Sequence, residues 1–230
     1  LKDFEPSREN KSVKTFKESF LTTGRLDAEY YQPKYEEIEN HIRQYRYGFS
    51  FIKDQFKQNK STIDYLAEKY NYIEIGDINV SNGTYNYNKI ETHDLPANAK
   101  IKSEKNNLLI SKVRPNRGAI SIIDNDIHDL IVSGAFTVLK EKTDYKKEVL
   151  FVYLRLKQIG EWLLKYNVGT SYPVIKDEDI LDLPIPIIAP AVQTEIAVLI
   201  KKSFALRAES ERLLHEAKET VEREIEKGYS

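Results

Sequence analysis

The chain has 230 residues, of which 40% are hydrophobic and 31% are charged, and its formal net charge is −1. No apolar run reaches the roughly 20 residues that a membrane-spanning helix needs, so we expect no membrane span. The absence of cysteine excludes disulfides and thiolate metal sites and favours a cytoplasmic protein. The sequence starts at Leu1 and contains no methionine, so we expect a fragment of a longer chain or missing modified methionines.

The first 60 residues are mixed in charge and are predicted to form a partly helical N-terminal extension. After Pro33, the residues Tyr35, Ile38, Ile42 and Tyr45 recur at spacings of three and four. This spacing predicts one apolar stripe of an amphipathic helix.

Short runs rich in β-branched residues predict strands in the middle of the chain. These runs are Tyr72–Ile78, Leu108–Val113, Ala119–Ile123 and Leu130–Leu139. Turn residues separate them, and Lys147–Tyr166 follows as a predicted helix in which Trp162 lies on the apolar stripe and is assigned to the core. We therefore predict a mixed α/β fold, α+β-like, with more antiparallel character than a regular βαβ alternation would give.

The segment Leu183–Ile188 is predicted to be extended, because two prolines at a spacing of two forbid a helix before them. Pro190 suits the first turn of a helix, and no glycine or proline follows until after Lys227. At 1.5 Å per residue this helix is about 57 Å long. It carries a heptad stripe and cannot bury that stripe alone, so it is predicted to pair with a partner helix. The proposed pairing residues are Ile196, Leu199, Leu206, Leu213 and Ala217.

Signals of catalysis are missing from the sequence. No glycine-rich phosphate loop, nucleophile elbow or cysteine nucleophile is present, and the four histidines have no metal-ligand spacing. Asp177, Glu178 and Asp179 with Lys176 could form a nuclease cluster, but three adjacent acids are more typical of a solvated helix start. We therefore expect no enzymatic activity, no cofactor and no metal.

The near-neutral total charge hides a basic segment. Between Lys100 and Arg117 six basic residues accompany a single acid, Glu104. The loop Ser111–Gly118 contains most of the candidate DNA-binding residues, because Lys and Arg neutralise phosphates, and Arg and Asn read base edges. These candidates are Lys112, Arg114, Asn116 and Arg117. The alternative is an exposed basic loop that keeps the strand ends in contact with solvent and does not bind DNA.

Two further loops are candidates. Asn167–Pro173 offers small hydrogen-bond donors and an aromatic ring in Thr170, Ser171 and Tyr172, and Lys176 follows it. Its alternative is a helix-stop loop with Gly169 as the C-terminal cap. Asn82–Lys89 is rich in Asn and Tyr, which suit either adaptable recognition or a hairpin turn.

The order of these segments resembles the specificity (S) subunits of type I restriction–modification systems. The resemblance spans residues 70–225, and Leu26–Tyr35 extends it at the N-terminus. The residues that carry it are Tyr72–Asn79, Asn107–Ile120, Gly169–Ile188 and the long helix after Pro190. The most specific part is the proline-bounded strand Leu183–Pro186, which leads into the long helix.

The resemblance implies a target-recognition domain over residues 1–187 that binds double-stranded DNA, followed by a spacer and dimerisation helix over residues 188–230. It implies an antiparallel coiled coil, methyltransferase (M) and restriction (R) subunits as partners, and a bipartite DNA site. Only one recognition domain is visible here, so we expect a homodimer or an intramolecular pseudo-dimer. The alternatives are a scaffold protein that dimerises without binding DNA, and the recognition half of a fused restriction–methylation enzyme.

Overall fold

The strands form three sheets in the computed structural model, which describes residues 8–9, 11–169 and 171–228. Two sheets have four strands, in the orders β2-β9-β6-β7 and β4-β3-β8-β5, and the third pairs β1 with β10. Every pair is antiparallel except β3 with β8, which confirms the expected antiparallel character. The strands are β1 (Phe49–Phe51), β2 (Phe56–Gln58), β3 (Lys69–Ile73), β4 (Asn88–Glu91), β5 (Ala99–Lys102), β6 (Leu108–Ser111), β7 (Ile120–Ile122), β8 (Leu130–Ser133), β9 (Phe136–Glu141) and β10 (Pro184–Pro186).

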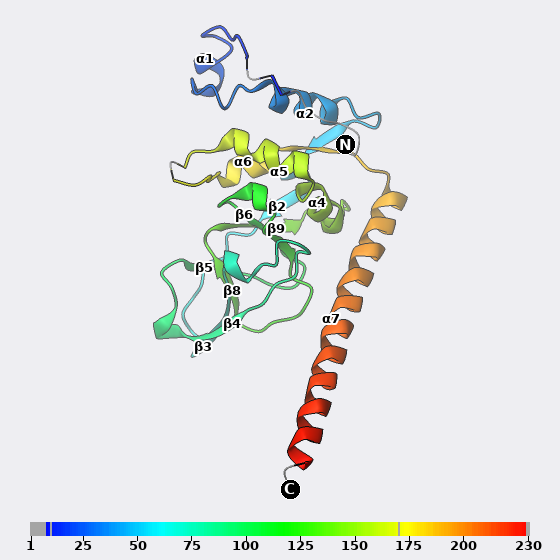
Figure 1. The fold of residues 1–230 in the computed structure, drawn as a ribbon. Helices are drawn as coiled ribbons and strands as arrows, with labels where there is room; N and C mark the ends of the chain where they lie inside the picture. The colour runs from blue at the N-terminus through cyan, green and yellow to red at the C-terminus, as the bar shows by residue number, and fades with distance from the viewer. Residues whose placement is uncertain (1–7, 10, 170, 229–230) are drawn as a thin grey trace.

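Helices cover one side of this assembly, and a single long helix runs down its flank (Figure 1). The α-helices are α1 (Phe20–Thr23), α2 (Pro33–Arg43), α3 (Ile52–Gln55), α4 (Lys147–Leu154), α5 (Lys157–Leu163), α6 (Asp177–Leu181) and α7 (Pro190–Lys227). Short 3-10 turns are η1 (Ile75–Asp77), η2 (Thr92–Asp94), η3 (Pro115–Arg117) and η4 (Leu164–Tyr166). The mixed fold with a long C-terminal helix is thus confirmed.

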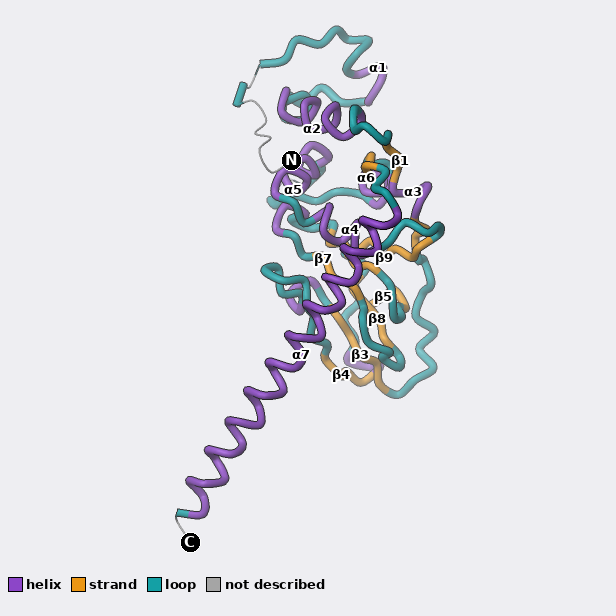
Figure 2. Tube along the Cα trace, turned by 90° about the vertical axis from the view of Figure 1, so that its right-hand side faces the viewer, coloured by secondary structure: helices purple, strands orange, loops and turns teal. Residues whose placement is uncertain are grey.

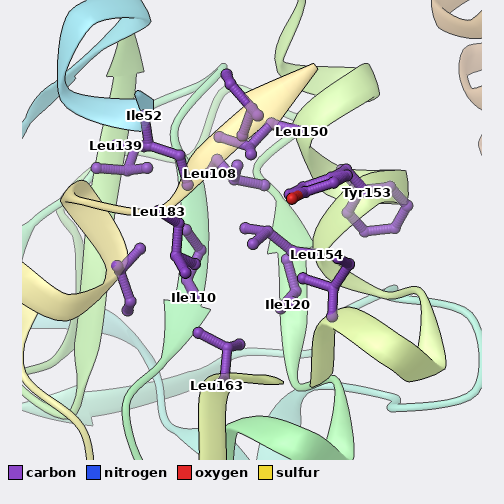
Figure 3. Close-up of a cluster of buried hydrophobic side chains, with 14 of the residues drawn as sticks. Ile52, Leu108, Ile110, Ile120, Leu139, Leu150, Tyr153, Leu154, Leu163 and Leu183 are labelled. Atoms are coloured by element: carbon purple, nitrogen blue, oxygen red, sulfur yellow. The ribbon is translucent and has the colours of Figure 1, made fainter. Parts of the chain in front are cut away.

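In the sheet β2-β9-β6-β7, the strands β6 and β7 and the first four residues of β9 are buried on both faces. Leu109 and Val138 pack with Ile73 and Val132 of the other four-stranded sheet. On the opposite face Leu108, Ile110 and Ile120 pack against the helices, and Figure 3 shows these side chains meeting Leu150, Tyr153 and Leu154 of α4. Burial on both faces explains why β6 begins with a continuous apolar run and shows no alternation.

Two strand predictions need correction. Leu130–Leu139 is not one strand but two, β8 and β9, which lie in different sheets and are separated at Gly134 and Ala135. Tyr72–Ile78 is a strand only to Ile73, because η1 follows. The Asp77 carboxylate accepts the backbone N–H of Glu74 at 2.8 Å, which closes this turn.

The predicted helix Lys147–Tyr166 is also wrong in its continuity: it breaks into α4, α5 and η4. Leu156 is extended, with ψ at 135°, although no glycine or proline stands near the break. Tertiary packing accounts for this, because α4 lies against β7 and α7 whereas α5 lies against η3 and α2. One straight rod could not contact both sets of neighbours. Trp162 is fully buried, as predicted.

Three helical or extended segments agree with their predictions. The helix α2 begins at Pro33 and buries Tyr35, Ile38 and Ile42, but it ends at Arg43, so Tyr45 of the predicted stripe lies beyond it. The proline-bounded segment forms β10, and α7 spans 38 residues from Pro190. None of the helices over the described ranges is long and apolar enough to cross a membrane.

Only the first part of α7 packs on the domain. Gln193 and Ala197 are buried, and Phe204 meets Phe151 of α4 edge to face with ring centroids 5.9 Å apart. Beyond Phe204 every described residue of the helix is exposed. Figures 1 and 2 show the helix passing alongside the sheets and then projecting past them.

Candidate nucleic-acid interface

The loops Ser111–Gly118 and Asn167–Pro173 meet in space. Val113 and Val174 form an isolated antiparallel bridge. The backbone N–H of Arg114 donates to the carbonyl of Pro173 at 2.7 Å, and that of Ile175 donates to Lys112 at 3.0 Å. Two loops that are far apart in the sequence therefore form one surface.

The first loop has a constrained backbone. Arg114 adopts a left-handed conformation with φ at 49°, and Gly118 does so with φ at 71°. Between them η3 lies against α5, where a Cβ built on Gly160 would be 3.4 Å from the Cα of Asn116. The absence of a side chain at Gly160 allows this close approach. The side chains of Arg114, Asn116 and Arg117 are exposed.

Asn167 shapes the second loop. Its side-chain oxygen accepts the backbone N–H groups of Gly169 at 2.8 Å and Val174 at 3.0 Å. A Cβ on Gly169 would be 2.0 Å from the carbonyl oxygen of Tyr172, so only glycine fits there. Gly169 is not the helix cap, because η4 ends at Tyr166 and Asn167 occupies the cap position.

The described residues of the second loop face outward. Ser171 and Tyr172 are exposed, and the Arg114 guanidinium lies 5.6 Å from the centroid of the Tyr172 ring. Thr170 lies outside the described residues. In Figure 1 this loop, drawn in yellow with a grey gap, projects from the side of the domain opposite α7. In this view the Asn167–Pro173 loop and α7 thus lie on different sides of the molecule.

Lys112 is held by an acid. Its ammonium lies 3.2 Å from the Asp177 carboxylate, which also accepts the Thr137 hydroxyl at 2.5 Å. The two ionic side chains are only 18% and 27% exposed. The ion pair ties the start of α6 to the end of β6, and the Thr137 hydrogen bond ties it to β9, whereas Lys176 is exposed.

The three acids at residues 177–179 form the first turn of α6, as favoured from the sequence. The Asp179 carboxylate accepts the backbone N–H of Lys176 at 2.7 Å. Burial is the main cause that raises the pKa of Asp179. Across the described ranges no group of His, Asp and Glu side chains could hold a metal ion.

Arg155, which sequence reasoning did not single out, connects two loops. Its guanidinium donates to the carbonyl oxygens of Gly118 at 2.8 Å and Val80 at 3.0 Å. It also lies 5.1 Å from the ring centroid of Phe151, and burial lowers its pKa. No sequence signal could have found it, because both acceptors are backbone carbonyls distant in the chain.

The Asn82–Lys89 segment begins in a tight turn that packs against helices. Gly83 has φ at 78°, and the Ser121 hydroxyl donates to its carbonyl at 2.7 Å. A Cβ on Gly83 would be 2.5 Å from the Phe151 ring. The segment also lines a cavity shared with Phe204 and Arg207 of α7. The contacts therefore favour the turn interpretation.

A cavity of about 390 Å³ adjoins the paired loops. Ile75, Ile78 and Val80 contribute apolar surface, while Arg114, Arg117 and Tyr172 contribute cationic and aromatic groups. Apolar side chains can contact a thymine methyl group, and arginine can bind a guanine edge or a phosphate.

The N-terminal segment braces the second loop. Arg25 pairs with Asp27 at 2.7 Å and donates to the backbone carbonyl of Asn167 at 3.0 Å. Tyr30 meets Tyr166 edge to face at 6.2 Å. The sequence placed Leu26–Tyr35 as an N-terminal extension of the recognisable region. Asp27 and Tyr30 of this segment lie beside the second loop through their contacts with Arg25 and Tyr166.

Comparison with known proteins identifies the family. The model of the type I restriction modification DNA specificity domain matches residues 45–218, which is most of the chain. The chain belongs to this family. The resemblance inferred from the ordered motifs is thereby confirmed, and the matched region includes both candidate loops and most of α7.

A curated relative with a related sequence is only distantly similar to this chain. The specificity subunit of the type I restriction enzyme HindI from Haemophilus influenzae is 26% identical over 143 residues, which cover 61% of this chain and 28% of that subunit. The chain therefore spans less than a third of this curated relative.

Two solved structures share the fold. The HsdS subunit from Thermoanaerobacter tengcongensis is 21% identical with a TM-score of 0.55, over 76% of this chain and 46% of that one. A chain from a structure describing complex assembly and conformational transition of the type I R-M system is 21% identical over the same shares, with a TM-score of 0.56. The fold of this chain is thus shared by the matched parts of both structures.

Proposed function

We propose that this chain recognises a specific sequence in double-stranded DNA and directs M and R subunits to a bipartite site. In this proposal the chain performs no chemistry of its own, needs no cofactor and acts in the cytoplasm. Membership of the DNA specificity family and the loop geometry support the assignment.

The observation that supports DNA recognition most directly is the backbone pairing of the two loops. It gathers exposed cationic, amide, hydroxyl and aromatic groups on one surface. The groups assigned to DNA contact are Arg114, Asn116, Arg117, Thr170, Ser171, Tyr172 and Lys176. Arginine can bind guanine edges or phosphates, and asparagine can bind an adenine edge. Lys112, the remaining candidate from the sequence, pairs with Asp177, so we assign it to holding the first loop in place and not to DNA contact.

We assign residues 1–187 to the recognition domain, with 1–60 as its N-terminal extension, and residues 188–230 to the spacer helix. The helix presents exposed apolar side chains in Leu199, Leu206 and Leu213, and Ala217 continues the stripe. Ile196 instead packs on the core of its own domain. A second copy, or a second half of one chain, would cover the stripe in an antiparallel coiled coil.

Two domains related by a two-fold axis would read a split, palindromic target. The experiment is a binding assay with the M subunit and a duplex selected from a random DNA library. Replacing both Arg114 and Arg117 by alanine is expected to weaken binding at least about tenfold, or ~1.4 kcal/mol. Lys105→Ala, an exposed charge removed elsewhere in the basic segment, is the matched control.

Equal binding by the double variant and the control would remove the loops from the interface. If the wild-type chain dimerised but selected no DNA, the scaffold alternative would replace the proposal.

A further inference from the structure

An apolar groove opens beside the first turns of α7. It has a volume of about 390 Å³ and is formed by α2, α4, the residues after β10 and the helix itself. Val152 on α4 is 36% exposed although the surrounding side chains are apolar. The principal lining residues are Ile42, Tyr45, Val149, Val152, Ile188 and Ile196.

The other end of α7 carries a matching apolar line. Leu214, Val221 and Ile225 are 58%, 59% and 55% exposed. Their spacings of seven and four place them on one face of the helix. An amphipathic helix binds a hydrophobic groove by inserting an apolar line of this kind. The helix cannot fold back on itself, so its own groove is out of reach of this line.

Charge is distributed unequally along α7. Residues 190–207 contain three basic side chains and one acid, whereas residues 208–227 contain seven acids and four basic side chains. Parallel pairing of two copies would place the two acidic halves together. Antiparallel pairing places each acidic half beside a basic half, which favours that direction.

We propose that the C-terminal end of α7 from a second copy of this chain seats Val221 and Ile225 in the groove, while Leu214 continues the apolar contact along the helix. The inference rests on the dimer of the proposed function and adds where the helix ends bind. Two antiparallel helices of about 57 Å that overlap fully bring each C-terminal end beside the other helix's start. That start is where Ile188 and Ile196 line the groove.

This contact fixes the register of the two helices, which the coiled-coil stripe alone does not fix. Ser203, Ser210 and Ala217 interrupt the leucines, and small side chains at core positions allow the two helices to slide. Grooves that receive both helix ends stop such sliding. The groove therefore sets the register of the pair, and with it the distance between the two recognition domains.

Disulfide cross-linking tests the arrangement, because the chain has no cysteine of its own. A mixture of Val152→Cys and Ile225→Cys chains is expected to form a cross-linked dimer under oxidation, whereas neither variant alone does. Self-cross-linking of Ile225→Cys would indicate parallel pairing and overturn the proposal. A dimer in which the mixture stays uncross-linked would also overturn it while leaving the proposed dimer intact. A monomer by light scattering would overturn the dimer and this inference together.

A pair of matched substitutions gives an independent readout. Val221 and Val198 are each 59% exposed on α7, but they lie on different sides of the helix. Val221→Asp is expected to raise the dimer dissociation constant at least about tenfold, because it places a charge in an apolar groove. Val198→Asp should leave dimerisation unchanged, and circular dichroism verifies that both variants remain helical. Equal effects of the two substitutions would contradict the proposal.

Discussion

Arg155 donates from its guanidinium to the carbonyl oxygen of Gly118 at 2.8 Å, and the same group reaches Val80 at 3.0 Å. Gly118 ends the turn that presents Asn116 and Arg117. One half-buried side chain thus fixes the end of the first candidate recognition loop to the turn around Val80.

Arg155→Lys is expected to impair DNA discrimination more than general DNA affinity. Lysine keeps the charge but cannot bridge two carbonyl groups with a planar fork. The lost hydrogen bond should lower the free energy of unfolding by about 1–2 kcal/mol. Binding to selected and random duplexes measures discrimination, and Arg46→Lys, at an exposed arginine, is the control. An unchanged ratio between the two duplexes would refute the positioning role.

Gly169→Ala is expected to abolish the conformation of the second loop. The added Cβ would be 2.0 Å from the Tyr172 carbonyl oxygen, a distance that forces the backbone to move. We expect DNA binding to weaken at least about tenfold. The melting temperature should change little, because the loop is at the surface. Gly228→Ala, where the Cβ would meet nothing closer than 3.4 Å, serves as the control. Normal DNA binding by Gly169→Ala would show that this loop does not contribute.

Lys112→Ala should behave as a stability variant and not as a DNA-contact variant. The substitution removes the ammonium that pairs with the partly buried Asp177 carboxylate and leaves the carboxylate its hydrogen bond from the Thr137 hydroxyl. The free energy of unfolding is expected to fall by about 1–2 kcal/mol, measured by urea titration. The salt dependence of DNA binding should stay as in the wild type, because no phosphate contact is lost. A shallower salt dependence would instead assign Lys112 to a phosphate.

A heptad inserted or deleted between Leu206 and Val221 is expected to change the gap in the DNA target. Seven residues lengthen a helix by about 10 Å, which corresponds to about three base pairs. The two half-site sequences should stay the same, because the loops lie on the recognition domain. Methylation-site mapping measures both, and an unchanged gap would rule out a ruler function for α7.

Local sequence determined some elements, while tertiary contacts determined others. Prolines predicted an extended segment over Leu183–Ile188, within which β10 lies, and an uninterrupted helical sequence predicted α7 with its observed bounds. The break at Leu156 and the separation of β8 from β9 could not be predicted, since they depend on which surfaces those segments pack against. Amino-acid composition identified each of the two loops separately as a candidate. Their convergence through Arg114 and Pro173 requires the folded chain.

Base-resolution mapping of DNA methylation in cells that carry this chain with its M subunit tests the central claim most directly. We predict methylation at a bipartite site with two-fold related half-sites. That pattern should disappear when Arg114 and Arg117 are both replaced by alanine, with the protein still folded. An identical methylation pattern with the double variant, or no pattern that depends on this chain, would contradict its role in DNA recognition.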